Sequence, residues 1–224
     1  MDSPLSESRR GLDIGRCFNE AIAVYKENFL ILFVAAILFQ ILSGLSLFIL
    51  CGPLEGGVCL MTLNALRRND RTAQLGDLFG AFDKFGRLVG LFFLVLVLTL
   101  LGLVACVLPG LALMTIWLFP FFLVVDRGMT VFDALSASKD IVMRNGFWKN
   151  LLLVLIAIAL TSGPDLIPYA GVIVSFFLAP LGWLVMTSAY LQQAPDAAPV
   201  SEEPAPRDEP PNRDDLGEAI KPGP

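Results

Sequence analysis

A small set of polar side chains could do chemistry in this chain, and each stands beside or within an apolar segment. Glu55 follows Pro53 in a connection rich in Pro and Gly, where a carboxylate can bind a cation or a lipid amine at the mouth of a cavity. A solvated loop carboxylate is the commoner case. Gln40, Ser43 and Ser46 recur at i, i+3 and i+6 and could line a polar path, although hydrogen bonds between packed helices are their more usual role.

Asn28 and Asn145 stand at corresponding points, each shortly before an apolar run. An asparagine at such a point most often caps the bend between two helices, and contact with a ligand is the second interpretation. With Glu55, Gln40 and Ser43, these two residues make up the polar candidates for a binding site.

The chain lacks the groups that most catalytic classes need. It has no histidine, so the commonest general base and the commonest metal ligand are missing. Its four cysteines have no C-x-x-C spacing and are typical of small buried side chains, with a disulfide between Cys51 and Cys106 as the alternative. No Gly-rich phosphate loop and no basic-aromatic pattern for nucleic acid is present. We therefore expect no enzyme activity, no cofactor, no metal and no nucleic-acid partner.

The composition is that of a multi-pass membrane protein. Of the 224 residues 55% are hydrophobic, the mean hydropathy is +0.70, and uncharged runs exceed the length that crosses a hydrocarbon core of about 30 Å. The sequence predicts an all-α fold with six transmembrane helices. The expected spans are 29–50, 53–66, 88–107, 111–125, 151–161 and 167–191, with Pro120 and Pro180 as kinks.

The distribution of basic residues decides the topology. Residues 1–192 carry 13 Lys+Arg, and all fall in three stretches, whereas the connections around Pro53, Pro109 and Asp165 have none. By the positive-inside rule the three basic stretches are cytoplasmic and the three connections face outward. Because this requires the weakly apolar segment 53–66 to cross, we expect six spans in the bacterial cytoplasmic (inner) membrane, with both termini cytoplasmic.

The three basic stretches also have helical patterns. Amphipathic interfacial helices are expected at about 13–28, 72–86 and 130–145, with Asp13 and Thr130 as caps. A constant shift of 117 positions lays the third stretch on the first, which predicts an internal repeat of interfacial helix plus hairpin. Residues 1–12 form a polar N-terminal segment. Residues 193–224 are acidic and rich in Pro, typical of a disordered cytoplasmic tail.

Several strings resemble an uncharacterised family of bacterial multi-pass integral membrane proteins. They are GPLEGGVCLMTLNALRRNDRTAQLGDLFGAFDKFG, VLPGLAL, VVDRGMTVFDALSASKDIVMRN and APLGWLVMTSAYLQ. The membrane domain found with some glycerophosphoryl diester phosphodiesterases is similar, but the catalytic domain of those enzymes has no counterpart here. The resemblance implies fold and location and carries no assigned reaction.

Two functions remain open on these grounds. The first is a non-catalytic accessory, scaffold or assembly component of the membrane, with membrane lipid, a protein partner or a homo-oligomer as its contacts. The second is a transporter or lipid-handling protein that uses Pro-broken helices as a binding site. A polar cavity reaching the midplane near Gln40 and Ser43 would favour the second, and a dry, fully packed core would count against it.

Overall fold

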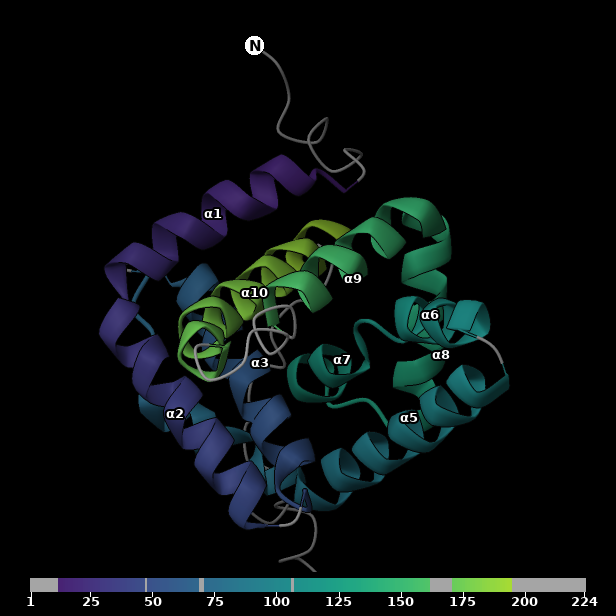
Figure 1. Cartoon of the computed structure of the whole chain (residues 1–224), viewed down its shortest axis with the longest axis horizontal. Coiled ribbons are helices and arrows are strands. Elements are labelled where there is room, and N and C mark those ends of the chain that lie inside the picture. Colours follow the sequence, from purple (N-terminus) through teal and green to yellow (C-terminus); the bar gives the residue numbers. More distant parts are fainter. Residues whose placement is uncertain (1–11, 47, 69–70, 106, 162–170, 195–224) are drawn as a thin grey trace, which may run out of the picture.

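The computed structural model describes residues 12–46, 48–68, 71–105, 107–161 and 171–194. In this part of the chain every regular element is a helix, which confirms the all-α prediction (Figure 1). The first eleven residues, and the predicted tail from residue 195 on, lie outside the described residues, whereas Gln193, predicted as the first tail residue, is buried at the end of α10. The elements are α1 (Ile14–Glu27), α2 (Phe29–Leu45), α3 (Cys51–Arg67), α4 (Leu75–Phe79), the 3₁₀ helix η2 (Gly80–Lys84), α5 (Phe85–Ala105), α6 (Val107–Ile116), α7 (Pro120–Arg127), α8 (Val131–Asn145), α9 (Phe147–Thr161) and α10 (Gly171–Gln193).

Several helices are long and apolar enough to cross a membrane. Three qualify singly, over Leu75–Val104, Leu108–Arg127 and Val174–Gln193. The pairs α1 with α2 and α8 with α9 qualify when each is taken together, and they bend by 94° and 110° at their junctions. The helices thus suit a membrane location.

The helices α1 and α8 begin in the same way. Asp13 accepts a hydrogen bond from the Arg16 N–H at 3.1 Å, and Thr130 accepts one from the Asp133 N–H at 3.4 Å. Each side-chain oxygen satisfies one of the free donors of a first helical turn. Both helices bury one face, through Cys17, Ala21 and Val24 in α1 and through Ala134, Leu135, Ser138, Ile141 and Val142 in α8.

The middle stretch differs from the predicted interfacial helix at 72–86. It consists of the five residues of α4 followed by η2, which runs directly into α5 without a sharp bend. Gly76, Gly80 and Gly86 lower the helix propensity here, and short 3₁₀ segments are the usual result of such a local weakness.

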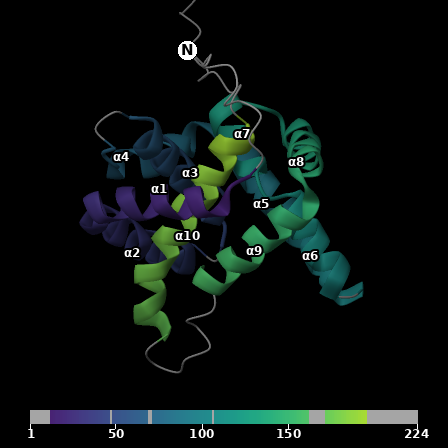
Figure 2. The same cartoon turned by 90° about the horizontal axis from the view of Figure 1, so that it is seen from above.

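The helix α3 lies at the centre of the bundle, where the views from two directions show it surrounded by α2, α5, α7 and α10 (Figures 1 and 2). Its glycines allow backbones to touch. A Cβ atom on Gly57 would lie 1.8 Å from the Leu78 carbonyl oxygen of α4, and one on Gly52 would lie 2.4 Å from the Leu88 oxygen of α5. Such contacts leave no room for a side chain larger than hydrogen.

This packing corrects the prediction for residues 51–57. The Pro/Gly cluster was expected as an outward turn, but it forms the first two turns of α3. Pro53 is tolerated there because a helix start lacks partners for its N–H groups in any case. The glycines serve close approach to α4 and α5, and the chain reverses earlier, before Cys51.

Pro120 stands at an interruption of the helical pattern inside the span Leu108–Arg127. The helix α6 ends at Ile116 and α7 begins at Pro120. Since proline has no N–H to give to the carbonyl four residues earlier, the Ile116 oxygen needs another donor. The Ser138 hydroxyl of α8 donates to that oxygen at 2.8 Å and accepts from the Phe119 N–H at 3.1 Å. The buried Ser138 hydroxyl therefore satisfies the backbone groups that the interruption leaves without helical partners.

We predict that Gly57→Ala lowers the free energy of unfolding by about 1–3 kcal/mol, because the added methyl group forces α3 away from α4. Thermal unfolding of the purified protein in mild detergent measures this. The matched control is Gly90→Ala in α5, where a Cβ meets no atom within 4 Å and helix propensity favours alanine. Equal melting temperatures for the Gly57→Ala variant and the natural chain would contradict the packing described.

Candidate functional site

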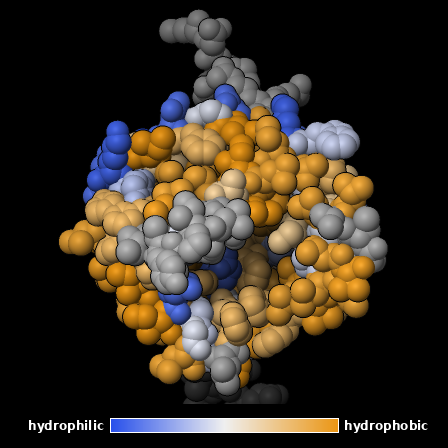
Figure 3. All heavy atoms as spheres, in the orientation of Figure 1, coloured by the Kyte–Doolittle hydropathy of each residue, from blue (hydrophilic) through white to orange (hydrophobic). Residues whose placement is uncertain are grey.

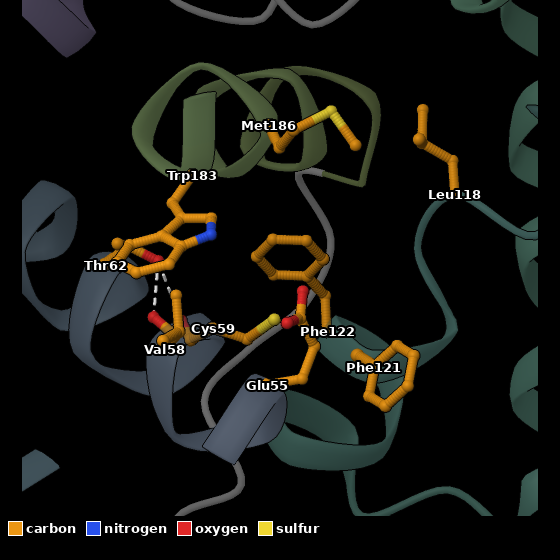
Figure 4. A pocket seen from close by; sticks show the side chains of 9 residues that line it. All are labelled: Glu55, Val58, Cys59, Thr62, Leu118, Phe121, Phe122, Trp183 and Met186. Atoms are coloured by element: carbon orange, nitrogen blue, oxygen red, sulfur yellow. Dashed lines mark hydrogen bonds between the residues drawn. The ribbon is translucent and has the colours of Figure 1, made fainter. Parts of the chain in front are cut away.

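A cavity of about 70 Å³ lies between α3, the segment at the start of α7, and α10. Figure 3 shows this face of the molecule as largely hydrophobic, with a hollow near its centre that has hydrophilic atoms at its bottom. The close view in Figure 4 shows the side chains that surround the cavity. They are Glu55, Val58, Cys59, Thr62, Leu118, Phe121, Phe122, Trp183 and Met186.

Glu55 is the charged member of this lining. It was predicted on an exposed turn, but it lies in the second turn of α3 and is half-buried. Its carboxylate points into the cavity, beside the Cys59 sulfur and the Phe122 ring (Figure 4). Within the described part of the chain it has neither a hydrogen-bond donor nor an ion-pair partner. An unpaired carboxylate inside a helical bundle of this kind is costly, and it marks a binding site by default.

Helical spacing brings the lining residues together. Glu55, Cys59 and Thr62 are four and three residues apart, so they share one face of α3. Trp183 and Met186 are three apart on α10 in the same way. The two faces are joined where the Thr187 hydroxyl donates to the Thr62 hydroxyl at 2.7 Å. The helical spacing of Glu55, Cys59 and Thr62 can be read from the sequence, but it has this meaning only when α3 is known to begin at Cys51.

The aromatic walls of the cavity are held by neighbouring rings. Phe122 stacks on Tyr190, with centroids 5.0 Å apart and planes at 17°. Trp183 packs against Phe39 of α2, with centroids 5.6 Å apart. Aromatic pairs at these distances add stability beyond their buried area, so the walls are preformed.

A buried polar network stands directly behind the Phe122 wall. Arg67, at the end of α3, makes two parallel hydrogen bonds to Asp126 of α7, at 2.5 and 2.9 Å. The Tyr190 hydroxyl of α10 donates to the same carboxylate at 2.9 Å. The Asp126 side chain is only 3% exposed, so its charge depends on these partners. The sequence analysis missed this network, because nothing local to Asp126 points to residues 59 and 64 positions away.

Two further basic residues hold the end of α7. The Lys84 ammonium donates to the Val125 carbonyl at 2.9 Å, and Arg87 donates to the Gly128 carbonyl at 3.1 Å. Cations are favourable at a helix C-terminus because the last carbonyls lack partners within the helix. Lys84 and Arg87, both in a predicted cytoplasmic stretch, thus help to hold the end of α7 in place.

The other predicted site residues lie away from the cavity. Gln40 is exposed, and Ser43 is buried with no hydrogen-bond partner for its hydroxyl. The Asn28 amide donates to the Val24 and Arg71 carbonyls at 2.9 and 2.6 Å, and its oxygen accepts from the Ala73 N–H at 2.8 Å. Through these contacts the Asn28 side chain stabilises the bend between α1 and α2.

Asn145 donates to the Ile141 carbonyl at 2.9 Å, which is a helix-end contact at the bend between α8 and α9. Asp165, the carboxylate of the third predicted connection, lies outside the described residues. The structure therefore brings Glu55, alone among the predicted candidates, to the cavity.

The cysteines and possible metal ligands give no second site in the described ranges. Cys17, Cys51 and Cys59 are buried free thiols, while Cys106, the alternative partner of Cys51, lies outside the described residues. Burial raises the pKa of the Cys17 thiol to about 11, which keeps it protonated and unreactive at neutral pH. No group of three His, Cys, Asp or Glu side chains in the described part could hold a metal ion.

Comparisons with models of protein families, with curated proteins and with solved structures found no match. The resemblance described above stays a hypothesis.

We predict that Asp126→Asn lowers the free energy of unfolding by about 3 kcal/mol, because it leaves the half-buried Arg67 guanidinium without its counter-charge. Denaturation in detergent measures the loss. Asp140→Asn is the matched control: it makes the same change on an exposed α8 carboxylate and should shift stability by less than about 0.5 kcal/mol. In Arg67→Gln with Asp126→Asn the loss should be smaller than the sum of the single losses. Strict additivity would show that the two side chains do not interact.

Proposed function

We propose that this chain is a non-catalytic, multi-pass protein of the bacterial cytoplasmic membrane that binds an amphiphilic molecule, such as a membrane lipid, in its central cavity. The observation that carries the proposal is the unpaired Glu55 carboxylate facing a preformed aromatic cavity. Small-molecule sites generally combine apolar walls with a few polar groups that orient the ligand. This cavity has that character.

The cavity favours the lipid-handling function over the accessory or scaffold function. A scaffold needs a surface and has no use for an internal carboxylate whose burial is costly. At about 70 Å³ the cavity is smaller than the 300–1,000 Å³ or so of a site that encloses a whole drug-sized ligand. It therefore takes one end of an amphiphile, while the apolar remainder lies along the hydrophobic face of the bundle.

The available groups argue against catalysis. The cavity offers one carboxylate and the Cys59 thiol, and the sequence has no histidine to act as a base. General acid–base work usually pairs two titratable groups whose environments differ. A binding role asks only for complementarity to the ligand.

The proposed topology keeps six spans with both termini cytoplasmic. The three single helices and the two bent pairs supply five crossings, and α3, about 25 Å long at 1.5 Å per residue, supplies the sixth. Gly52, at the start of α3, lies against Leu88, at the start of α5. This contact favours a start of α3 on the cytoplasmic side, and a reporter fusion just before α3 decides between that placement and a sixth crossing.

The proposed repeat is supported by contacts that recur at the shift of 117. The cap of Asp13 on Arg16 corresponds to that of Thr130 on Asp133. The hydrogen bond from Asn28 to the carbonyl four residues earlier corresponds to that from Asn145, and each marks a sharp bend. Two side chains, one at the start and one near the end of each helix, thus make corresponding contacts.

The topology predicts the outcome of reporter fusions. A fusion after Leu50, between α2 and α3, should report the outer side of the membrane, whereas one after Met129, between α7 and α8, should report the cytoplasm. Positive charge on the cytoplasmic side underlies this orientation. A cytoplasmic signal at both positions would remove α3 from the spans.

Lipid retention tests the binding function. We expect native mass spectrometry of the protein in mild detergent to show one retained lipid class. Met186→Trp, which fills the cavity, should lower its occupancy at least tenfold, and Asp140→Asn should leave it unchanged. Equal melting temperatures of the two variants would exclude loss through unfolding. Equal occupancy in both, or a co-purifying protein with no lipid, would contradict the proposal and favour the scaffold.

A further inference from the structure

We infer that the cavity binds the primary ammonium group of its ligand, with Glu55 as the counter-ion. This inference rests on the proposed function and names the chemistry of the ligand head.

Glu55 is the acidic residue that faces the cavity, and no Lys or Arg in the described part pairs with it. Arg67, at the other end of α3, is paired with Asp126 through both terminal nitrogens of its guanidinium. A cationic ligand supplies the missing partner, whereas an anionic head would be repelled and a neutral one would leave the carboxylate uncompensated.

The walls favour the same class of ligand. Phe121, Phe122 and Trp183 place three aromatic side chains around the space that the carboxylate faces (Figure 4). The faces of aromatic rings attract cations, including the ammonium groups of ligands. Thr62, the hydroxyl in the lining, already donates to Val58 and accepts from Thr187. The carboxylate is thus the acceptor left for the ligand.

Size and hydrogen bonding select a primary ammonium. The cavity volume of about 70 Å³ has room for about five water molecules, at roughly 10–15 Å³ for each. A primary ammonium on a two-carbon stem fits that space and has three N–H donors for the carboxylate. A trimethylammonium group is bulkier and has no N–H to donate. The same head occurs on an amine lipid of the ethanolamine type and on a free alkylamine.

The test uses the full chain in mild detergent and three probes with the same six-carbon tail. Hexylamine should raise the melting temperature with saturation, hexyltrimethylammonium should bind at least tenfold more weakly, and hexanol should have no saturable effect. Glu55→Gln should weaken hexylamine binding at least tenfold, and Asp140→Asn should leave it unchanged. The melting temperature of the Glu55→Gln protein without probe should equal or exceed that of the natural chain, because the variant removes an unpaired buried charge.

The outcomes separate this inference from the proposed function. If hexanol competes as well as hexylamine, or if Glu55→Gln binds hexylamine normally, the ammonium assignment is wrong while an amphiphile site still stands. If no probe and no lipid binds, both fail. A fall in the melting temperature of Glu55→Gln would show a structural role for the carboxylate and would also overturn the assignment.

The source of the ammonium is resolved in nanodiscs. Discs of phosphatidylglycerol with added phosphatidylethanolamine should block hexylamine binding if the ligand is a lipid head, and discs of phosphatidylglycerol alone should not. Hexylamine binding that is unaffected by either disc would assign the site to a soluble amine. Both results retain the ammonium chemistry.

Discussion

The ion pair between Arg67 and Asp126 joins the three helices that enclose the cavity. Arg67 belongs to α3 and Asp126 to α7, and Tyr190 brings α10 to the same carboxylate. Because Tyr190 also stacks on Phe122, the network fixes one aromatic wall as well as the helices behind it. A buried pair of this kind is poor as a source of net stability, but loss of one partner is severe. Its effect is to specify one arrangement of α3, α7 and α10.

A second constraint is that backbone groups freed by breaks must find partners, since lipid offers none. The break before Pro120 is satisfied by Ser138, and the bend at Asn28 is satisfied by the asparagine amide. Asn28 reaches further and holds the chain at Arg71 and Ala73. Polar side chains that stand between apolar runs in the sequence thus complete the backbone, and this leaves few polar groups for a ligand.

Local signals allowed much of this to be predicted from the sequence. Apolar runs predicted helices, and Asp13 and Thr130 predicted two helix starts, because a cap depends on neighbours three residues away. Glu55 was predicted in a turn because Pro and Gly often form turns. In the structure Gly52 and Gly57 lie within α3, where the lack of a side chain lets α5 and α4 pack against its backbone. Close packing of two helix backbones depends on both segments, so the sequence around one of them does not predict it. The partners of Asp126 could not be predicted for the same reason.

Asp126 and Glu55 are two acidic residues of the bundle with opposite surroundings. The fold places an arginine and a tyrosine on Asp126 and leaves it 3% exposed, so burial of this charge is fully compensated. The same bundle leaves Glu55 without a partner in the described part, although an uncharged residue at that position would remove the cost of burial. A chain able to pair one carboxylate so completely does not need the other for its fold. The unpaired carboxylate is explained when its partner is a cation that comes from outside the protein.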